Sequence, residues 1–522
     1  MMAEDHGRAA VSRPTPPLAR VPIDGVHYRS RGCLLVAGPP ARTLAVAEGL
    51  SKDLSVVALV QGEPPETLPD GVRVVPGRLA KLEGVLGGFR AYAQGPQTLL
   101  DIGPLSANRD GCYDLVLDLS RPPVLCREVP PQGYYAPGDD PAALRQALQA
   151  LPGLRGDIHK PRYFRFDPAL CAHLSHGVQG CTRCLEVCPA EAIRCGKEGV
   201  EVDPRLCQGC GTCTLVCPSG ALRYDHPSPR LILRELRSAI GEATEAPTVR
   251  FHEPGGARSE PPGPVVSIQV HALASVGPEI WLAALAWGAR RVVLEPSPTL
   301  PPSSLRALNS QLGFIRQLLG HLGLPVDALA PLEAETQDAG GPAQGLVPPL
   351  RPAEADITLP KRALLLQLMD TLAPPEGTPD PMALAPGAPF GGIQVDAEAC
   401  TLCTACVSLC PAGALGAQEA SLWLLESRCV QCGICERGCP EGALHRVPRL
   451  TFDRGDRARP RRLHQAEMAR CVDCGAPFLA AQLVQKGLAR ILSDPRLRDT
   501  DLSRLKMCPA CRIKATMEDS VR

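Results

Sequence analysis

Four copies of a Cys-x2-Cys-x3-Cys-Pro motif carry the most distinctive chemistry of this chain. The copies begin at Cys181, Cys210, Cys403 and Cys432. Three of the copies have a further cysteine three positions upstream, at Cys207, Cys400 and Cys429. Thiolates at this spacing, followed by proline, form the ligand run of a [4Fe-4S] cluster, whose last cysteine serves the other cluster of a pair. The motifs therefore predict iron-sulfur centres arranged in pairs.

The spacing has a physical reason. Two residues between thiolates let one tight loop offer three sulfurs to one cubane, while amides of the loop hydrogen-bond its sulfides. Proline after the last cysteine fixes φ, so the chain leaves the site in a set direction. The gap from Cys188 to Cys207 equals the gap from Cys410 to Cys429. We therefore expect two modules of one architecture.

Structural zinc and disulfide bonds are the competing uses of so many cysteines. Zinc needs four ligands per site, and it does not require a third and a fourth cysteine at these spacings with proline behind them. A disulfide framework suits short secreted chains, whereas this chain has 522 residues and we expect no secretory leader. Iron-sulfur ligation accounts for the whole pattern.

Residues 166–226 and 395–446 resemble the two-cluster bacterial ferredoxin family. The resemblance implies four [4Fe-4S] clusters, each held by three cysteines of one run and one cysteine of the other run in the same module. The implied ligand sets are Cys181, Cys184 and Cys217 with a fourth ligand that the family pattern does not supply (site 1); Cys207, Cys210, Cys213 and Cys188 (site 2); Cys400, Cys403, Cys406 and Cys439 (site 3); and Cys429, Cys432, Cys435 and Cys410 (site 4).

The first ligand of site 1 departs from the family pattern. Cys171 is separated from Cys181 by nine residues instead of two, and the insertion contains His173 and His176. A long loop can still return a thiolate to the site, because the entropic cost of loop closure grows slowly with length. We expect Cys171 to be the fourth ligand, and imidazole ligation by one of the two histidines is the alternative.

A different cysteine pattern stands near the C-terminal end. Cys471 and Cys474 form one Cys-x2-Cys pair, Cys508 and Cys511 form another, and helical spacing of leucines separates them. Two such pairs supply four thiolates, and Gly475 allows a tight turn, so we expect one zinc ion here. A fifth iron-sulfur cluster is the alternative. The four remaining cysteines lack partners at ligand spacing and are expected to be free thiols: Cys33, Cys112, Cys126 and Cys195.

Composition excludes several classes of function. The chain has 55 Lys and Arg against 55 Asp and Glu, so it lacks the basic excess typical of nucleic-acid binding. Its most apolar stretch, 280–289, is too short to span a bilayer, and we expect a cytoplasmic location. With 56 prolines, 49 glycines and 3% aromatic residues, the chain favours several small domains over one large core.

Hydrophobic periodicity predicts two small α/β domains beside the two modules. The first has strands at 33–38, 54–60 and 113–119 and a helix at 41–50; it lacks the glycines of a dinucleotide turn, so a docking or structural role is favoured over a nucleotide site. The second has strands at 265–270 and 291–294 and helices at 278–288 and 305–322.

The predicted fold class is α/β plus α+β multidomain, with two small ferredoxin-like dicluster modules interleaved with two small α/β domains and a C-terminal zinc-ribbon-like knuckle of four cysteines. The expected order is a flexible tail (1–30), an α/β domain (31–165), module 1 (166–228), a helix and linker (229–264), an α/β domain (265–345), a Pro-rich linker with one helix at 361–372 (346–390), module 2 (391–450) and a zinc-binding region (451–522) that opens with a solvated arginine-rich stretch.

Residues 270–289 are similar to the iron-sulfur delta subunit of methyl-viologen-reducing hydrogenases, which works beside heterodisulfide reductase. That family has a cysteine where this chain has Ala272, and its other cluster cysteines are also missing here. The resemblance therefore implies an interaction scaffold without a cofactor.

Taken together, the chain resembles polyferredoxin-type subunits that accompany bacterial formate dehydrogenases and heterodisulfide-reductase-like complexes. The resemblance implies a subunit that relays single electrons through four clusters, in modules held at a distance by the α/β domains, between a redox enzyme and an acceptor. Because no flavin, nicotinamide or molybdopterin site is recognisable, we expect a non-catalytic component whose partners are redox proteins. An iron-sulfur redox sensor or a metalloenzyme maturation scaffold is the alternative.

The cysteine patterns predict a definite metal content. Protein prepared without oxygen should carry about sixteen iron atoms and about one zinc ion per chain, as measured by plasma emission spectroscopy. An iron content of about eight atoms per chain would mean that only one module binds clusters. More than about sixteen iron atoms without zinc would mean that the C-terminal cysteines bind an iron-sulfur cluster.

Overall fold

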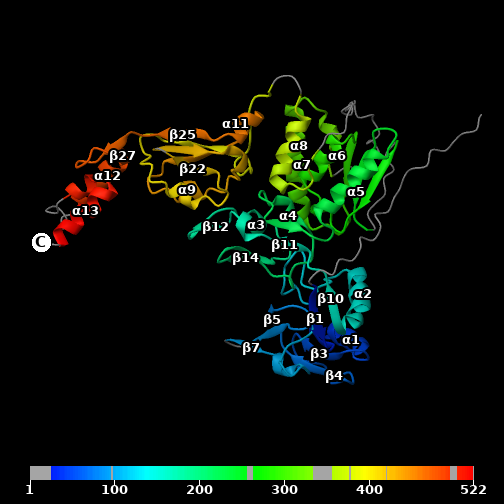
Figure 1. Cartoon of the computed structure of the whole chain (residues 1–522). Helices are drawn as coiled ribbons and strands as arrows, with labels where there is room; N and C mark the ends of the chain where they lie inside the picture. Colours follow the sequence, from blue (N-terminus) through cyan, green and yellow to red (C-terminus); the bar gives the residue numbers. More distant parts are fainter. Residues whose placement is uncertain are drawn as a thin grey trace, which may run out of the picture.

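A computed structural model describes residues 25–95, 98–254, 263–332, 355–374, 378–418, 420–493 and 502–520 (Figure 1). Along the chain it contains an N-terminal α/β domain, a first cysteine-rich module, a second α/β domain, a second cysteine-rich module and a C-terminal helical region. In Figure 1 the first module lies between the N-terminal domain and the second module. None of the described helices combines the length and apolar character needed to cross a bilayer.

The N-terminal domain is built on a five-stranded parallel sheet of order β4-β3-β2-β8-β9. Its elements are β2 (Cys33–Gly38), α1 (Pro40–Leu50), β3 (Ser55–Val60), β4 (Val72–Pro76), β8 (Leu115–Asp118), β9 (Tyr134–Tyr135) and α2 (Pro141–Ala150). The central strands β2 and β8 are buried along their whole length because both faces of the sheet are covered. Residues of α1 and α2 pack on one face, and the antiparallel sheet of β5 (Leu79–Glu83), β6 (Arg90–Gln94) and β7 (Leu99–Asp101) lies toward the other.

The N-terminal tail is shorter than the sequence predicts. Residues 26–30 form β1 (Val26–Ser30), which pairs antiparallel with β10 (Gly156–Lys160). The assignment of 26–30 to a flexible tail is therefore wrong, because the strand that orders this short segment lies about 130 residues away in the sequence. Residues 1–24 lie outside the described part of the chain.

The second α/β domain draws on more of the chain than expected. Its parallel sheet has the order β18-β17-β19, with the helices α5 and α6 against it. The elements are α5 (Pro229–Gly241), β17 (Thr248–His252), β18 (Val265–Gln269), α6 (Pro278–Ala286), β19 (Arg291–Glu295), α7 (Pro302–His321) and α8 (Lys361–Leu372). Helix α6 is buried on all sides, as its largely apolar sequence requires, and Glu279 is its one charged residue.

Two predicted boundaries of this domain need correction. The central strand β17 falls in the stretch that the sequence assigns to a helix and linker, so a division at 264 cuts the sheet. Helix α8 occupies the predicted residues, but it packs into the domain core through Leu364, Leu368 and Met369 and is not part of a free linker. Residues 333–354 lie outside the described part of the chain.

The two cysteine-rich modules share one plan. In each, an outer pair of antiparallel strands brackets the module, a hairpin separates the two cysteine runs, and a short helix lies within each run, just before its last cysteine. The first module contains β11 (Phe164–Phe166), β12 (Leu174–Ser175), β13 (Val178–Gln179), α3 (Arg183–Glu186), β14 (Ile193–Gly196), β15 (Gly199–Val202), α4 (Thr212–Val216) and β16 (Leu222–Tyr224). The second contains β20 (Met382–Ala383), β21 (Gly391–Val395), α9 (Ala405–Leu409), β22 (Leu415–Gln418), β23 (Ser421–Leu424), α10 (Ile434–Arg437) and β24 (Leu444–Leu450).

The C-terminal region begins within the second module. Strand β25 (Arg461–Gln465) pairs with β23, so a module boundary at 450 excludes one of its strands. The arginine-rich stretch is also less solvated than predicted, because Arg457 of α11 (Arg454–Ala458) is buried and donates to Thr451 O and Phe452 O. Beyond β25 lie β26 (Met468–Arg470), β27 (Pro477–Ala480), α12 (Ala481–Ser493) and α13 (Pro509–Ser520).

Candidate metal centres

The second module contains two cavities lined by cysteines. One is lined by all four residues of site 3: Cys400, Cys403, Cys406 and Cys439. The other is lined by all four residues of site 4: Cys410, Cys429, Cys432 and Cys435. Three cysteines of one run thus meet the last cysteine of the other run around each cavity. Four soft sulfur donors around one cavity fit a cluster of several iron atoms.

The backbone around these sites turns amides toward the sulfurs. After the first cysteine of sites 2, 3 and 4, the second and fourth residues have positive φ: Gly209 and Gly211, Leu402 and Thr404, and Gln431 and Gly433. Three of these residues are not glycine, and such strain concentrates at functional sites. Amides of Gly209, Leu402 and Gln431 stabilise the thiolate forms of Cys207, Cys400 and Cys429. Such inward-facing amides favour an anionic centre.

Burial and mutual repulsion oppose ionisation of the cysteines. Burial, together with the charges of the other cysteines of each set, raises the pKa of Cys207 and of Cys432 to about 11 and the pKa of Cys406 to about 12. A group of buried thiols becomes a group of thiolates only when a cation compensates their charge. The sites are therefore suited to binding iron and not to remaining as free thiolates.

Site 1 gathers Cys171 with the other three cysteines. Burial raises the pKa of Cys171, and Cys217 and Cys181 are among the charges that act on it. In the same way, Cys217, Cys181 and Cys171 act on Cys184, whose pKa burial also raises. The strands β12 and β13 form a hairpin in the insertion, and this hairpin returns the chain from Cys171 to Cys181.

Neither histidine of the insertion is placed as the alternative ligand requires. His173 is buried, with Nδ1 2.8 Å from Cys181 O and Nε2 3.0 Å from Cys195 Sγ, so both ring nitrogens already have partners. His176 is exposed at the hairpin turn, with Nδ1 3.2 Å from Ser175 Oγ. The contact with His173 also gives Cys195 a partner that its sequence position, 22 residues away, does not indicate.

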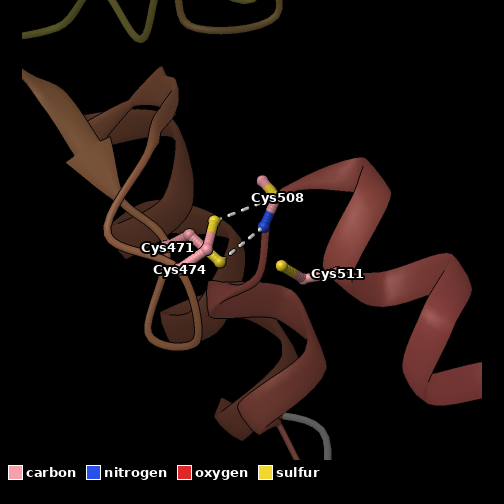
Figure 2. A group of neighbouring side chains, drawn as sticks. All are labelled: Cys471, Cys474, Cys508 and Cys511. Carbon is pink, nitrogen blue, oxygen red and sulfur yellow. Dashed lines mark hydrogen bonds between the residues drawn. The ribbon is translucent and has the colours of Figure 1, made fainter.

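The four C-terminal cysteines form a much tighter group. Their sulfurs all lie within 4.8 Å of one another, and Cys474 Sγ lies 3.7 Å from Cys508 Sγ (Figure 2). Four sulfurs at about 2.3 Å from one tetrahedral ion would be about 3.8 Å apart. Among the described residues no ferredoxin set is this compact, since no other group of Cys, His, Asp or Glu meets the same 4.8 Å limit. The group fits one metal ion better than a cubane.

Hydrogen bonds prepare one of these thiols to ionise. Amides of Cys474 and Cys508 lower the pKa of Cys471 to about 6. The Cys508 amide donates to Cys471 Sγ at 3.2 Å (Figure 2). Gly475, with φ of 73°, closes the turn after the first pair. These features are typical of a metal-binding knuckle.

The two modules contact each other where site 1 faces site 4. Arg437 of α10 donates through Nε to Gln179 O of β13 at 2.8 Å. A Cβ atom at Gly180 would lie only 2.7 Å from Ile434 Cδ1. The backbone of the first module therefore packs directly on α10 of the second. Cys181 is among the charges that raise the pKa of Cys432. The expectation that the α/β domains hold the modules at a distance is therefore wrong.

Comparison with known families agrees with this geometry. Residues 179–221 match a family model described as a 4Fe-4S dicluster domain, and residues 399–444 match a second model of the same description. No curated protein matches the chain. The chain therefore contains two 4Fe-4S dicluster ferredoxin domains, which confirms the prediction of two such modules and supports a polyferredoxin-type protein. Cys171 precedes the first matched segment, which begins at 179.

The placement of Cys171 leads to a test of site 1. Cys171→Ser should reduce iron by about four atoms per chain, because one cubane loses a thiolate while three sites keep complete sets. His173→Ala and His176→Ala are matched controls within the same insertion and should keep about sixteen iron atoms. Iron loss in a histidine variant, with full iron in Cys171→Ser, would assign the fourth ligand to imidazole.

Proposed function

We propose that this protein relays single electrons along one row of four [4Fe-4S] sites, in the order site 2, site 1, site 4, site 3. The observation that carries the proposal is the contact between the modules, which puts Cys181 of site 1 close to Cys432 of site 4. Two isolated pairs would need an external carrier between them, whereas a contact between pairs makes the path continuous within one chain.

Electrostatic neighbours support the same order within each module. Cys184 of site 1 is among the charges acting on Cys213 of site 2, and Cys406 of site 3 is among those acting on Cys435 of site 4. Each adjacent pair of sites in the row is thus joined by at least one pair of neighbouring cysteines. A cluster bound at each site would accept and release one electron at a time.

The second α/β domain supports the contact between modules. The first two residues of α8 reach different modules: Lys361 donates to Thr214 O and Leu215 O of α4, whereas Arg362 donates to Ser427 O and Cys429 O beside site 4. Adjacent residues of one rigid helix therefore fix both modules. Partial burial of the cluster cysteines limits their contact with water.

The ends of the row identify where partners would bind. Site 2 lies against the N-terminal domain and the segment 272–275, since Gly211 closely approaches Ala274 and Ser275. Site 3 lies toward the C-terminal region, where Lys486 of α12 donates to Ala399 O at 2.8 Å. We propose that a formate dehydrogenase-like or heterodisulfide-reductase-like enzyme exchanges electrons at one end and an acceptor protein at the other. Family resemblance supports the choice of enzyme, and the segment similar to hydrogenase delta subunits lies at the site 2 end.

The C-terminal cysteines are proposed to bind one structural zinc ion. Four sulfurs in a compact group, all from protein side chains, complete a tetrahedral shell without an open position. The ion would join the β26–β27 hairpin to the start of α13 (Figure 2). This region lies next to site 3 through the bonds from Lys486 to Ala399 O and from Arg490 to Glu441.

Weakening the contact between modules should separate the row into two pairs. Arg437→Ala removes hydrogen bonds to Gln179 O that are worth about 1 kcal/mol, which is about a fivefold shift toward undocked modules. Pulsed electron paramagnetic resonance of partly reduced protein should then show weaker coupling between modules, with unchanged coupling within each module.

Arg428→Ala is the matched control, because Arg428 is exposed on the same module. This variant should keep both couplings. Wild-type protein without coupling between modules would contradict the row, and a single reducible cluster with three silent sites would favour a redox sensor.

The partner enzyme can be tested in the native host. Affinity purification of the tagged protein without oxygen should recover a molybdopterin or flavin enzyme in stoichiometric amount, and Arg437→Ala should recover the same enzyme with slower electron transfer through the complex. Recovery of maturation factors with an incomplete metalloenzyme would contradict the relay and support an assembly scaffold.

A further inference from the structure

A buried lysine contacts the backbone beside site 2. Lys160, at the end of β10 in the N-terminal domain, donates through Nζ to Arg205 O at 2.8 Å and to Cys207 O at 2.7 Å. It is 8% exposed and lies 5.3 Å from the centre of the Tyr28 ring. Its ammonium therefore lies against the loop that carries the first ligand of a cluster run.

A buried arginine makes the equivalent contacts beside site 4. Arg362 of α8 donates through Nε to Ser427 O at 2.7 Å and through a terminal nitrogen to Cys429 O at 2.6 Å. It is 9% exposed, and its guanidinium lies 4.6 Å from the centre of the Phe390 ring. In both modules the acceptors are the carbonyl of the first cysteine and the carbonyl two residues before it.

The similar fold of the two modules does not explain why each has a buried cation bonded to the same two backbone carbonyls. Neither cation belongs to a ferredoxin module: one comes from a strand of the first α/β domain and the other from a helix of the second. Two different domains thus place a positive charge against equivalent backbone carbonyls of the two modules. Each charge also has a nearby carboxylate, Asp203 for Lys160 and Glu426 for Arg362. Glu426 is already bonded to Arg449 and Thr451.

The cations near the other two sites are more accessible to water. Lys486, beside site 3, has a side chain 39% exposed and lies 3.4 Å from Glu441. Arg183, beside site 1, is half-buried and lies 3.5 Å from Cys181 Sγ. Water and counter-charges screen such groups, whereas a buried cation acts through a medium of lower dielectric.

We propose that Lys160 and Arg362 are positioning residues that raise the reduction potentials at sites 2 and 4 above those at sites 1 and 3. The inference rests on the proposed function, because it requires clusters at these sites. Gain of one electron from a low-potential donor makes a site one unit more negative, with no bond formed and no proton moved, and a fixed positive charge stabilises that state. Potentials would then alternate along the row.

Lys160→Met tests the inference with a readout that a purely structural role would not move. In a dithionite titration followed by electron paramagnetic resonance, one of four potentials should fall by about 59 mV or more, a tenfold change in the one-electron equilibrium constant. Lys160→Arg should restore it. Arg362→Met should lower a different potential, Arg362→Lys should restore that one, and the double methionine variant should lower two.

Lys486→Met is the matched control, because its ammonium makes a similar bond to a backbone carbonyl but is exposed and close to Glu441. It should shift no potential as far as Lys160→Met does. If Lys160→Met loses iron, Lys160→Gln keeps a donor for the carbonyls without the charge and serves in its place.

These titrations distinguish failure of the proposed role of the two cations from failure of the proposed electron relay. Four reducible clusters with unchanged potentials in Lys160→Met and Arg362→Met would overturn the role of the cations and leave the relay intact. If the methionine variants lower the potentials and Lys160→Arg and Arg362→Lys do not return them to the wild-type values, the inference would also be overturned, because positive charge would not be the cause. Absence of reducible clusters in wild-type protein would overturn the relay.

Discussion

Burial of closely spaced thiols is the constraint on which the other features of this structure depend. Grouped cysteines in a poorly hydrated site resist ionisation, as the raised pKa values of Cys207, Cys406 and Cys432 show. A positively charged metal core removes that cost, and backbone amides directed at the sulfurs offset what remains. Leu402 and Gln431 have left-handed backbone conformations that are strained for residues other than glycine, and their amides act on Cys400 and Cys429.

The α/β domains act on the cysteine modules and do not merely separate them. Each domain supplies a buried cation to a ligand-bearing loop, and α8 also fixes both modules through consecutive residues. In the proposed function, this arrangement gives the two small α/β domains a structural role, because they fix the positions of the modules. Their surfaces define where the modules sit and which charges surround the sites, and these are the properties that an electron path requires.

Local signals allowed part of this structure to be predicted from the sequence. The cysteine spacing is a property of one loop, so the modules and their 4Fe-4S character could be predicted. The apolar strands 33–38 and 291–294 and the helix 361–372 likewise carry periodicity of their own. Compact placement of Cys471 with Cys508 agrees with the predicted knuckle, although the identity of its metal stays a prediction.

Contacts between distant residues could not be predicted in this way. Strand β1 pairs with β10, and β17 lies between two other strands. Each alternates apolar and polar residues over only five positions, which is too short to assign a strand without its partners. His173 and Cys195 meet across a hairpin, and Arg437 reaches Gln179 across 258 residues. Lysine and arginine at 160 and 362 look like ordinary surface residues until the fold buries them. The proposed row of sites likewise depends on tertiary structure.

Anomalous diffraction at the iron edge, from crystals grown without oxygen, would test the central claim most directly. The account predicts four iron clusters in one row, with a gap between sites 1 and 4 that is comparable to the gaps within the modules. Two pairs of clusters separated by a much longer gap would contradict a continuous path through this chain.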